Sequence, residues 1–358
     1  MIFFIKNSAC VGHARVQKFI NFFENKGFKT KNIIWSRDSK SEPNDLVILK
    51  GGGYGGARLA FKYVIWVTKL TMFLMTVKTK NKDHTFFAID FDAAIACYLA
   101  SRFRAEIKYI YDIHDEFAIR YKFPSFLKWL IKQIDQVVRK NALITVHVDH
   151  SRVGIEDTNY TVIQNITTDL SPTLNKRLKT SERTFVVSGL LCAQRGLEAL
   201  YRFAVHHPEC SFIAAGNITD HVAEKFIDCC NVDYRGYIPQ HELLRVSANA
   251  TGVFSLYDPS VEINRLAASN KLYDAMMLGI PVITNRGIAA SDFVNTHQIG
   301  FVVPFDYCSD WETLASMDLT KLENSGKNGR KLYESEFCGS GSFEGRSIPL
   351  LKVLRATG

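Results

Sequence analysis

Short apolar segments rich in β-branched and aromatic residues alternate with longer segments of helical period along most of the chain. Strands separated by helices imply parallel sheets with right-handed crossovers. The sequence therefore predicts an α/β fold with two doubly wound, Rossmann-like domains, whose ligands bind at the carboxyl ends of the strands. The predicted strands cover 3–5, 32–35, 45–49, 85–89, 108–113, 142–146 and 160–163 in the first half, and 184–188, 211–215, 251–256, 281–284 and 300–303 in the second.

A polar stretch without apolar period, residues 166–183, separates the two halves as a linker would. We therefore expect an N-terminal domain over 1–165 and a C-terminal domain over 184–335. The final segment, 336–358, is expected to cross back onto the first domain.

Composition restricts the class of protein. The chain has 358 residues, of which 47% are hydrophobic and 22% charged, as is typical of globular proteins with two domains. Its eight cysteines include no C-x-x-C pair, which argues against a disulfide framework or a zinc site and suits a reducing cytosol. The opening apolar run is too short for a signal peptide and indicates a first strand.

Charge is distributed unevenly between the halves. Residues 1–165 hold 25 Lys and Arg against 15 Asp and Glu, a balance of +10, whereas the remainder holds 19 against 21, a balance of −2. This asymmetry favours an anionic partner for the first half: membrane headgroups, nucleic acid or a phosphorylated ligand. The alternative is that the lysines only solvate a surface.

One predicted helix, from about 57 to 78, is almost entirely apolar and aromatic between Leu59 and Val77. Its length would suit a membrane span, but two lysines interrupt it and would be costly at a bilayer centre. It is either a basic amphipathic helix that lies in a membrane interface or a buried crossover helix with its lysines outward. The polar residues of its proposed stripe are Arg58, Lys62, Lys69, Thr76 and Lys80.

The segment GGGYGG (51–56) satisfies G-x-G-x-x-G between a strand and a helix, but as a dinucleotide motif it is weak. It follows the third strand, and no acidic residue appears about twenty positions later to bind a ribose. A loop of this kind can still hold a phosphate or simply make a tight turn, and we assign Gly53 to acceptor or membrane contact.

The segment YIYDIHDEF (109–117) carries acid–base chemistry at a strand end. His114, Asp115 and Glu116 follow a buried strand, where a doubly wound domain places reactive side chains. His114 could orient or deprotonate a hydroxyl, with Asp112 or Asp115 fixing its tautomer. The alternative is a set of surface polar residues. Other histidines have no carboxylate at metal-ligand spacing, so the sequence gives no support for a catalytic metal.

A cation and a carboxylate begin a short apolar helix at 270–278. The helix N-terminus, with Asn270 and Lys271, would hold a diphosphate, and Asp274 on the same face could accept hydrogen bonds from ribose hydroxyls. Gly279 ends the helix and Pro281 begins the next strand. A simple i,i+3 charge pair remains the alternative, worth only ~0.2–0.5 kcal/mol.

Several segments, in order along most of the chain, resemble the GT-B glycosyltransferases of family 4. The most specific is SNKLYDAMMLGIPVITNRG (269–287), which resembles the family's N-K-L-F/Y-E/D-x-M-x-x-G-x-P-V motif. The family's G-R-L-x-x-x-K-G loop is similar to 188–200, and its histidine region is similar to 88–103 with 111–117. The V-I-x-N that ends the family's N-terminal domain resembles 161–165, and a segment between its donor-domain strands resembles 235–244.

The resemblance implies two domains facing a cleft, and transfer of a sugar from a nucleotide-sugar with retention of anomeric configuration and without a bound metal. It makes His114 and Asp115 the catalytic residues, and it implies no other cofactor. The expected donor-binding residues are Arg195, Gly196, Arg265, Asn270, Lys271, Leu272 and Asp274.

Two positions depart from the family pattern. Leu190 stands where the family has an arginine, and Leu266 replaces the first glutamate of an E-x7-E pair. Arg265 or Lys271 would then supply the missing cation, and Arg195 takes the place of the usual lysine.

The leading hypothesis is a retaining glycosyltransferase at the inner face of the plasma membrane. It would move a sugar from a nucleotide diphosphate-sugar to a lipid-linked saccharide, as in O-antigen or capsule synthesis, with an anionic membrane surface and no nucleic acid as partner. The alternatives are a nucleotide-sugar epimerase on the same fold and a non-catalytic membrane-surface binder of sugar nucleotides.

Overall fold

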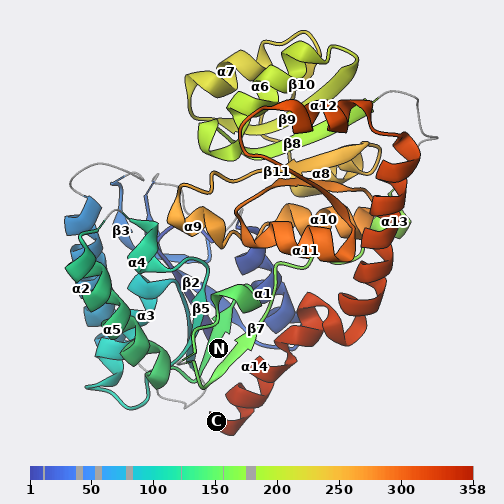
Figure 1. Ribbon diagram of the computed structural model, residues 1–358. Coiled ribbons are helices and arrows are strands. Elements are labelled where there is room, and N and C mark those ends of the chain that lie inside the picture. Colours follow the sequence, from blue (N-terminus) through green and yellow to red (C-terminus); the bar gives the residue numbers. More distant parts are fainter. Residues whose placement is uncertain are drawn as a thin grey trace. The chain divides into compact units, whose positions relative to one another are not determined.

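The computed structural model describes residues 1–10, 13–37, 43–52, 59–77, 84–121, 123–155, 157–174 and 183–357. The chain forms two compact units. Unit 1 comprises residues 1–164 and 344–358, and unit 2 comprises residues 165–343. Each unit is built around one parallel sheet covered by helices (Figure 1). The predicted α/β, doubly wound fold class is therefore confirmed.

Unit 1 contains a seven-stranded sheet in the order β3-β2-β1-β4-β5-β6-β7. The order reverses between β1 and β4, so a topological switch point lies at their carboxyl ends. The strands are β1 (Ile2–Lys6), β2 (Thr30–Ser36), β3 (Asp45–Lys50), β4 (Thr85–Ile89), β5 (Lys108–Ile113), β6 (Ile144–His147) and β7 (Tyr160–Val162). The helices are α1 (Ala14–Asn25), α2 (Leu59–Thr76), α3 (Phe91–Ser101), α4 (Phe117–Arg120), α5 (Ser125–Asn141) and α14 (Phe343–Thr357).

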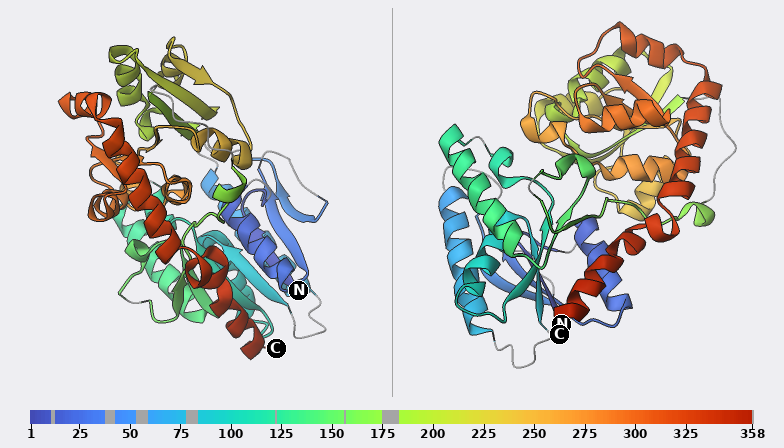
Figure 2. Two further views of the ribbon diagram at one scale, coloured as in Figure 1. Left: turned by 90° about the vertical axis from the view of Figure 1, so that its right-hand side faces the viewer. Right: turned by 60° about the horizontal axis from the view of Figure 1, so that its bottom comes forward.

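Helices cover both sides of this sheet (Figure 2). On one side, Phe19 and Phe23 lie one turn apart on α1, and their rings lie 4.8 and 6.0 Å from that of Phe87 on β4. On the other side, α2, α3 and α5 contribute to one buried core with β1, β2, β4 and β5. Apolar residues at helical spacing on α1 and α2 thus account for both layers.

Helix α2 is the one helix within the described ranges that is long and apolar enough to cross a membrane by length and composition. It nevertheless packs into the core of unit 1 through a stripe formed by Tyr63, Trp66, Leu70 and Leu74. The opposite stripe, which includes Phe61, Val64 and Met72, is also apolar and is exposed, as the interfacial interpretation of this helix requires and the fully buried one does not.

Unit 2 contains a six-stranded sheet in the order β10-β9-β8-β11-β12-β13, with a switch point between β8 and β11. The strands are β8 (Arg183–Leu191), β9 (Cys210–Ile218), β10 (Val232–Tyr234), β11 (Gly252–Ser255), β12 (Val282–Asn285) and β13 (Gly300–Val303). The helices are α6 (Leu197–His206), α7 (His221–Ile227), α8 (Gln240–Ser247), α9 (Glu262–Arg265), α10 (Asn270–Leu278), α11 (Ala289–His297), α12 (Ser309–Ser316) and α13 (Leu319–Glu336).

The predicted polar linker, 166–183, needs a correction in its first part. Ile166 and Thr167 are buried, and Asp169 forms a bidentate ion pair with Arg330 on α13, with distances of 3.0 and 2.7 Å. This part is therefore fixed within unit 2, since its polar side chains have partners there. Residues 175–182 lie outside the described residues.

Candidate functional site

A pocket of about 330 Å³ opens at the carboxyl ends of β8 and β9 in unit 2. Gly189 and Gly216 bring bare backbone to its wall, with φ of 97° and 139°. A Cβ on Gly216 would lie 1.8 Å from the carbonyl oxygen of Gly189, so only glycine allows these strand ends to approach. The remaining wall is formed by Ser188, Ala215, Asn217, Tyr237, Ile238, Gln240, Leu243, Tyr257, Ser269, Asn270, Lys271 and Asp274.

The N-terminus of α10 faces this pocket. Ser269 caps the helix, because its hydroxyl oxygen accepts a hydrogen bond of 3.2 Å from the backbone N–H of Lys271. The unpaired N–H groups of a first helical turn and a lysine favour an anion at this position. The predicted helix and its glycine stop are confirmed: α10 ends at Leu278, and Gly279 is left-handed with φ 68°.

Two cations gather around one aromatic ring beside the pocket. The guanidinium carbon of Arg195 lies 4.3 Å from the ring centroid of Tyr257, and Nζ of Lys271 lies 5.9 Å from the same centroid. Arg195 also donates a hydrogen bond of 3.1 Å to Asn264. Tyr257, which follows β11, therefore positions both predicted phosphate-binding cations.

Asp274 lines the pocket on the second turn of α10. One of its oxygens accepts a hydrogen bond from the hydroxyl of Thr167, and the other lies 3.5 Å from the amide nitrogen of Gln240. These contacts fix the carboxylate at the pocket wall, where it can accept hydrogen bonds from a polyhydroxyl ligand.

Three other residues predicted to bind the donor lie outside this pocket. Arg265 is exposed and donates to the carbonyl oxygen of Pro259. Leu272 is buried and does not line the pocket. Gly196 is left-handed and precedes α6, where a Cβ would lie 2.6 Å from Leu256, so its observed role is in packing.

In unit 1, His114 follows β5 and is held by buried charges. Its Nε2 lies 2.6 Å from an Asp112 oxygen, and Arg15 on α1 donates to the same carboxylate at 2.8 Å. The Asp112 side chain is fully buried. Burial alone would raise the pKa of Asp112, but Arg15 and His114 outweigh burial and lower it.

This geometry selects between the two predicted partners of the His114 ring. Because Asp112 is ionised, its carboxylate accepts a hydrogen bond from Nε2–H of His114, and in the neutral ring Nδ1 is then the acceptor nitrogen. Asp115 instead pairs with Arg152 at 3.3 Å. Asp112, and not Asp115, therefore sets the tautomer of the histidine.

Asp90, directly after β4, was not predicted as a site residue. It adopts φ 65°, and its carboxylate accepts hydrogen bonds of 3.0 and 3.4 Å from the backbone N–H groups of His114 and Asp115. A non-glycine residue in this conformation is held by its surroundings and often marks a functional site. The signal in the sequence was an aspartate directly after the apolar strand TFFAI.

His13 was also missed. Its ring stacks on that of His114 with centroids 4.9 Å apart. Burial and then the nearby Lys6 lower the pKa of His13, so the ring is neutral at pH 7. The two histidines come from loops after β1 and β5, which are too far apart in the sequence for spacing to reveal.

The residues assigned to acceptor or membrane contact are only partly described. Gly53 and Arg58 lie outside the described residues. Nζ of Lys62 would lie 2.9 Å from a Cβ on Gly52, so this side chain folds toward the glycine loop and not outward. Lys69 is exposed. Lys80 of the predicted basic stripe also lies outside the described residues, so among its described members Lys69 and Thr76 are exposed and Lys62 turns toward Gly52.

No group of three or more His, Cys, Asp or Glu side chains is arranged to hold a metal ion within the residues that the structure describes.

No protein-family model matches the sequence, and no curated protein matches it significantly. Solved structures do resemble it over its whole length. A sucrose-phosphate synthase from Thermosynechococcus elongatus has a TM-score of 0.71 at 14% identity, with 100% of both chains covered. A UDP-forming α,α-trehalose-phosphate synthase from Burkholderia vietnamiensis has a TM-score of 0.64 at 9% identity, with 99% of each chain covered. A protein of Listeria monocytogenes assigned as a UDP-N-acetylglucosamine 2-epimerase has a TM-score of 0.61 at 12% identity, covering 100% of this chain and 97% of that one. The fold is therefore that of the GT-B enzymes.

Proposed function

We propose that the protein is a retaining glycosyltransferase, similar to family 4, that moves a sugar from a nucleotide diphosphate-sugar to a lipid-linked saccharide. The observation that carries the proposal is the unit 2 pocket, in which Lys271, the first turn of α10 and Asp274 surround glycine backbone at two strand ends. Several of the similar structures are sugar transferases, and one of those is bound to UDP-2-fluoro glucose.

The roles in donor binding follow from charge. The diphosphate would lie against the N-terminus of α10, with Lys271 and Arg195 offsetting its negative charge. Asp274 would accept hydrogen bonds from the vicinal hydroxyls of the ribose. In this scheme the protein supplies the positive charge, so we expect binding to need no divalent ion, and it should persist in EDTA.

The decisive experiment replaces Asp274 with alanine and measures the affinity for UDP, GDP, ADP and dTDP and for their glucose conjugates by calorimetry. At least one ligand should bind the wild-type protein. Two hydrogen bonds to a charged acceptor are worth ~1.5–3 kcal/mol each, so affinity for that ligand should fall at least tenfold.

Asp292→Ala is the matched control, since Asp292 is an exposed acid on α11 of the same unit. It should bind the ligand as the wild-type protein does. Unchanged affinity in Asp274→Ala would remove the ribose role, and the absence of binding to every ligand would remove the donor site. Incubating a bound nucleotide-sugar without acceptor separates the alternatives: an epimerase converts the sugar, a transferase slowly releases it, and a non-catalytic binder leaves it intact.

The proposed acceptor and location rest on exposed apolar side chains of unit 1. On α2, Phe61, Val64 and Met72 are 67%, 62% and 63% exposed, and on α5 Phe126 and Trp129 are 71% and 57% exposed. Both helices lie on the same side of the sheet (Figure 1). Apolar side chains in this number on the outward surface of a helix layer favour a lipid interface, and the +10 charge of residues 1–165 favours an anionic one.

Replacing Phe61, Val64, Met72 and Met75 by serine should therefore weaken co-sedimentation with vesicles of phosphatidylcholine and phosphatidylglycerol more than tenfold. A control with Val205→Ser and Ile348→Ser, two exposed apolar residues on α6 and α14, should bind as the wild-type protein does. Binding should also weaken as salt rises. A wild-type protein that ignores these vesicles at low salt would contradict the membrane location.

A further inference from the structure

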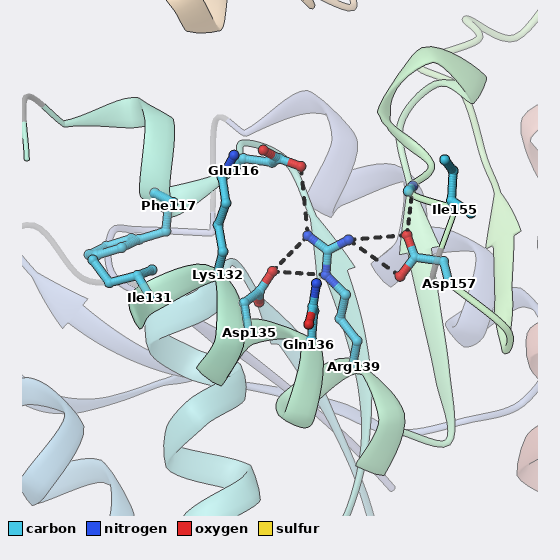
Figure 3. Close-up of a pocket in the computed structure, with 11 residues that line it drawn as sticks. Glu116, Phe117, Ile131, Lys132, Asp135, Gln136, Arg139, Ile155 and Asp157 are labelled. Atoms are coloured by element: carbon cyan, nitrogen blue, oxygen red, sulfur yellow. Dashed lines mark hydrogen bonds and ion pairs between the residues drawn. The ribbon is translucent and has the colours of Figure 1, made fainter. Parts of the chain in front are cut away.

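A second pocket, of about 310 Å³, lies wholly within unit 1 (Figure 3). It is bounded by the start of α4, by the middle of α5 and by Gly154, Ile155 and Asp157 between β6 and β7. It lies beside the reactive loop, because Glu116 at its edge is two residues from His114.

The back wall of this pocket is a closed network of ion pairs. The guanidinium of Arg139 lies 2.6 Å from Asp135, 3.1 Å from Asp157 and 3.8 Å from Glu116 (Figure 3). Asp157 further accepts a hydrogen bond of 3.0 Å from the backbone N–H of Gly154. The N–H groups of the Arg139 guanidinium are thus directed at these carboxylates, and they link α5 to Glu116 and Asp157.

The rim, in contrast, carries polar groups that are available to a ligand. Within the described residues, neither the Lys132 ammonium nor the Gln136 amide has a hydrogen-bond or ion-pair partner. Glu116 contributes a carboxylate whose single ion pair is long. Apolar surface lies between these groups, from Phe117 and Ile131 on one side and from the exposed Ile155 on the other.

The chemistry of the lining favours a neutral polyhydroxyl ring. Three carboxylates against two cations give the lining a formal charge of −1, which disfavours a phosphate. A sugar ring presents hydroxyl groups at its edge, which can pair with an ammonium, an amide and a carboxylate, and it presents C–H groups that pack on apolar side chains.

We propose that this pocket binds one saccharide residue of the acceptor. This inference rests on the proposed transferase function and extends it by naming where the acceptor is held. The ring would lie against Phe117 and Ile155, with Gln136, Lys132 and Glu116 on its hydroxyls. The exposed Phe126 and Trp129 lie at the N-terminal end of the same helix, α5, so one helix would contact both the saccharide and the lipid surface.

The test uses methyl glycosides of glucose, galactose, mannose, rhamnose and N-acetylglucosamine as probes, observed by saturation-transfer NMR on the full chain. At least one glycoside should receive saturation from the wild-type protein. Gln136→Trp fills the pocket and should reduce that signal at least fivefold. Gln133→Trp places the same side chain on an exposed position of α5 outside the pocket and should leave the signal unchanged.

Three results would overturn the inference: no glycoside binds, Gln136→Trp leaves the signal intact, or inorganic phosphate displaces the glycoside. Circular dichroism verifies that both tryptophan variants are folded. Nucleotide binding to unit 2, measured on the same samples, keeps the two proposals separate. Glycoside binding without nucleotide binding would retain the saccharide pocket and reject the transferase, and the reverse result would reject the pocket alone.

Discussion

The two units differ in the groups that lie at the carboxyl edge of their parallel sheets. At the carboxyl edge of unit 1, charged side chains are buried and paired: Arg15 with Asp112, and Asp90 with the amides of the His114 loop. At the carboxyl edge of unit 2, Gly189 and Gly216 leave bare backbone beside an open pocket. The same architecture therefore presents a prearranged set of side chains in one unit and a backbone surface in the other.

This difference indicates a division of labour. Paired buried charges keep one histidine in one tautomer, which suits a proton transfer or the orientation of a hydroxyl. Bare amides, a helix N-terminus and two cations on a tyrosine suit a diphosphate, whose recognition needs positive potential more than a particular side chain. Unit 1 would then supply the chemistry and unit 2 the affinity for the donor.

The variant His114→Ala tests most directly whether unit 1 supplies the chemistry and unit 2 the affinity for the nucleotide. Loss of a positioned acid–base or orienting group typically costs ~10²–10⁴-fold in rate. Release of sugar from the bound nucleotide-sugar should fall by that factor, while calorimetric affinity for the nucleotide changes less than twofold. His150→Ala, an exposed histidine of the same unit, is the control. Near-normal turnover in His114→Ala would make the histidine structural.

The fold was largely predictable from the sequence, because every element with a strong apolar run kept its type. Strand β10 was missed: Val232–Tyr234 has three residues and only one partly buried apolar side chain at its start, so it carries no periodic signal. The linker was extended too far because polarity alone does not reveal that Asp169 has a partner, Arg330, more than 150 positions later.

The site was predictable only where a motif is local. Asn270, Lys271 and Asp274 lie within one helix, and the structure brings all three to one pocket. Tyr257 contacts Arg195 and Lys271, which are distant in sequence, so no spacing rule could find it, and Asp90 was marked only by its place directly after an apolar strand. The sequence left two interpretations of α2 open, because a helix that is apolar nearly all round does not show which side is buried.

A second prediction concerns the buried acids that distinguish unit 1. Burial and then the neighbouring Asp90 raise the pKa of Asp92 to about 6 from its ordinary 3.8. The folded state thus binds the Asp92 proton more tightly than the unfolded chain does. The contribution to stability is complete below pH 3.8, is lost as pH rises toward 6, and is absent above it.

Asp92→Asn should remove this dependence. Between pH 4 and pH 7 the variant should gain about 2 kcal/mol in unfolding free energy relative to the wild-type protein. Urea unfolding followed by tryptophan fluorescence reports mainly on unit 1, which holds Trp35, Trp66 and Trp129, whereas unit 2 holds Trp311. Asp228→Asn, an exposed acid of unit 2, should show no such trend. If the unfolding free energies of Asp92→Asn and Asp228→Asn depend on pH in the same way, the folded state does not bind the Asp92 proton more tightly than the unfolded chain.

The smallest expected effect tests the cations of unit 2. Tyr257→Leu keeps an apolar side chain but removes the ring on which Arg195 and Lys271 lie. A cation over an aromatic face at a partly exposed site is worth ~0.5–1 kcal/mol, so nucleotide affinity should fall about two- to fivefold. Tyr257→Phe retains the ring and should bind within twofold of the wild-type protein by calorimetry. If the two variants lose affinity equally, the hydroxyl of Tyr257 and not its ring contacts the ligand. If neither loses affinity, the tyrosine does not position the cations, and the backbone and helix N-terminus hold the diphosphate without it.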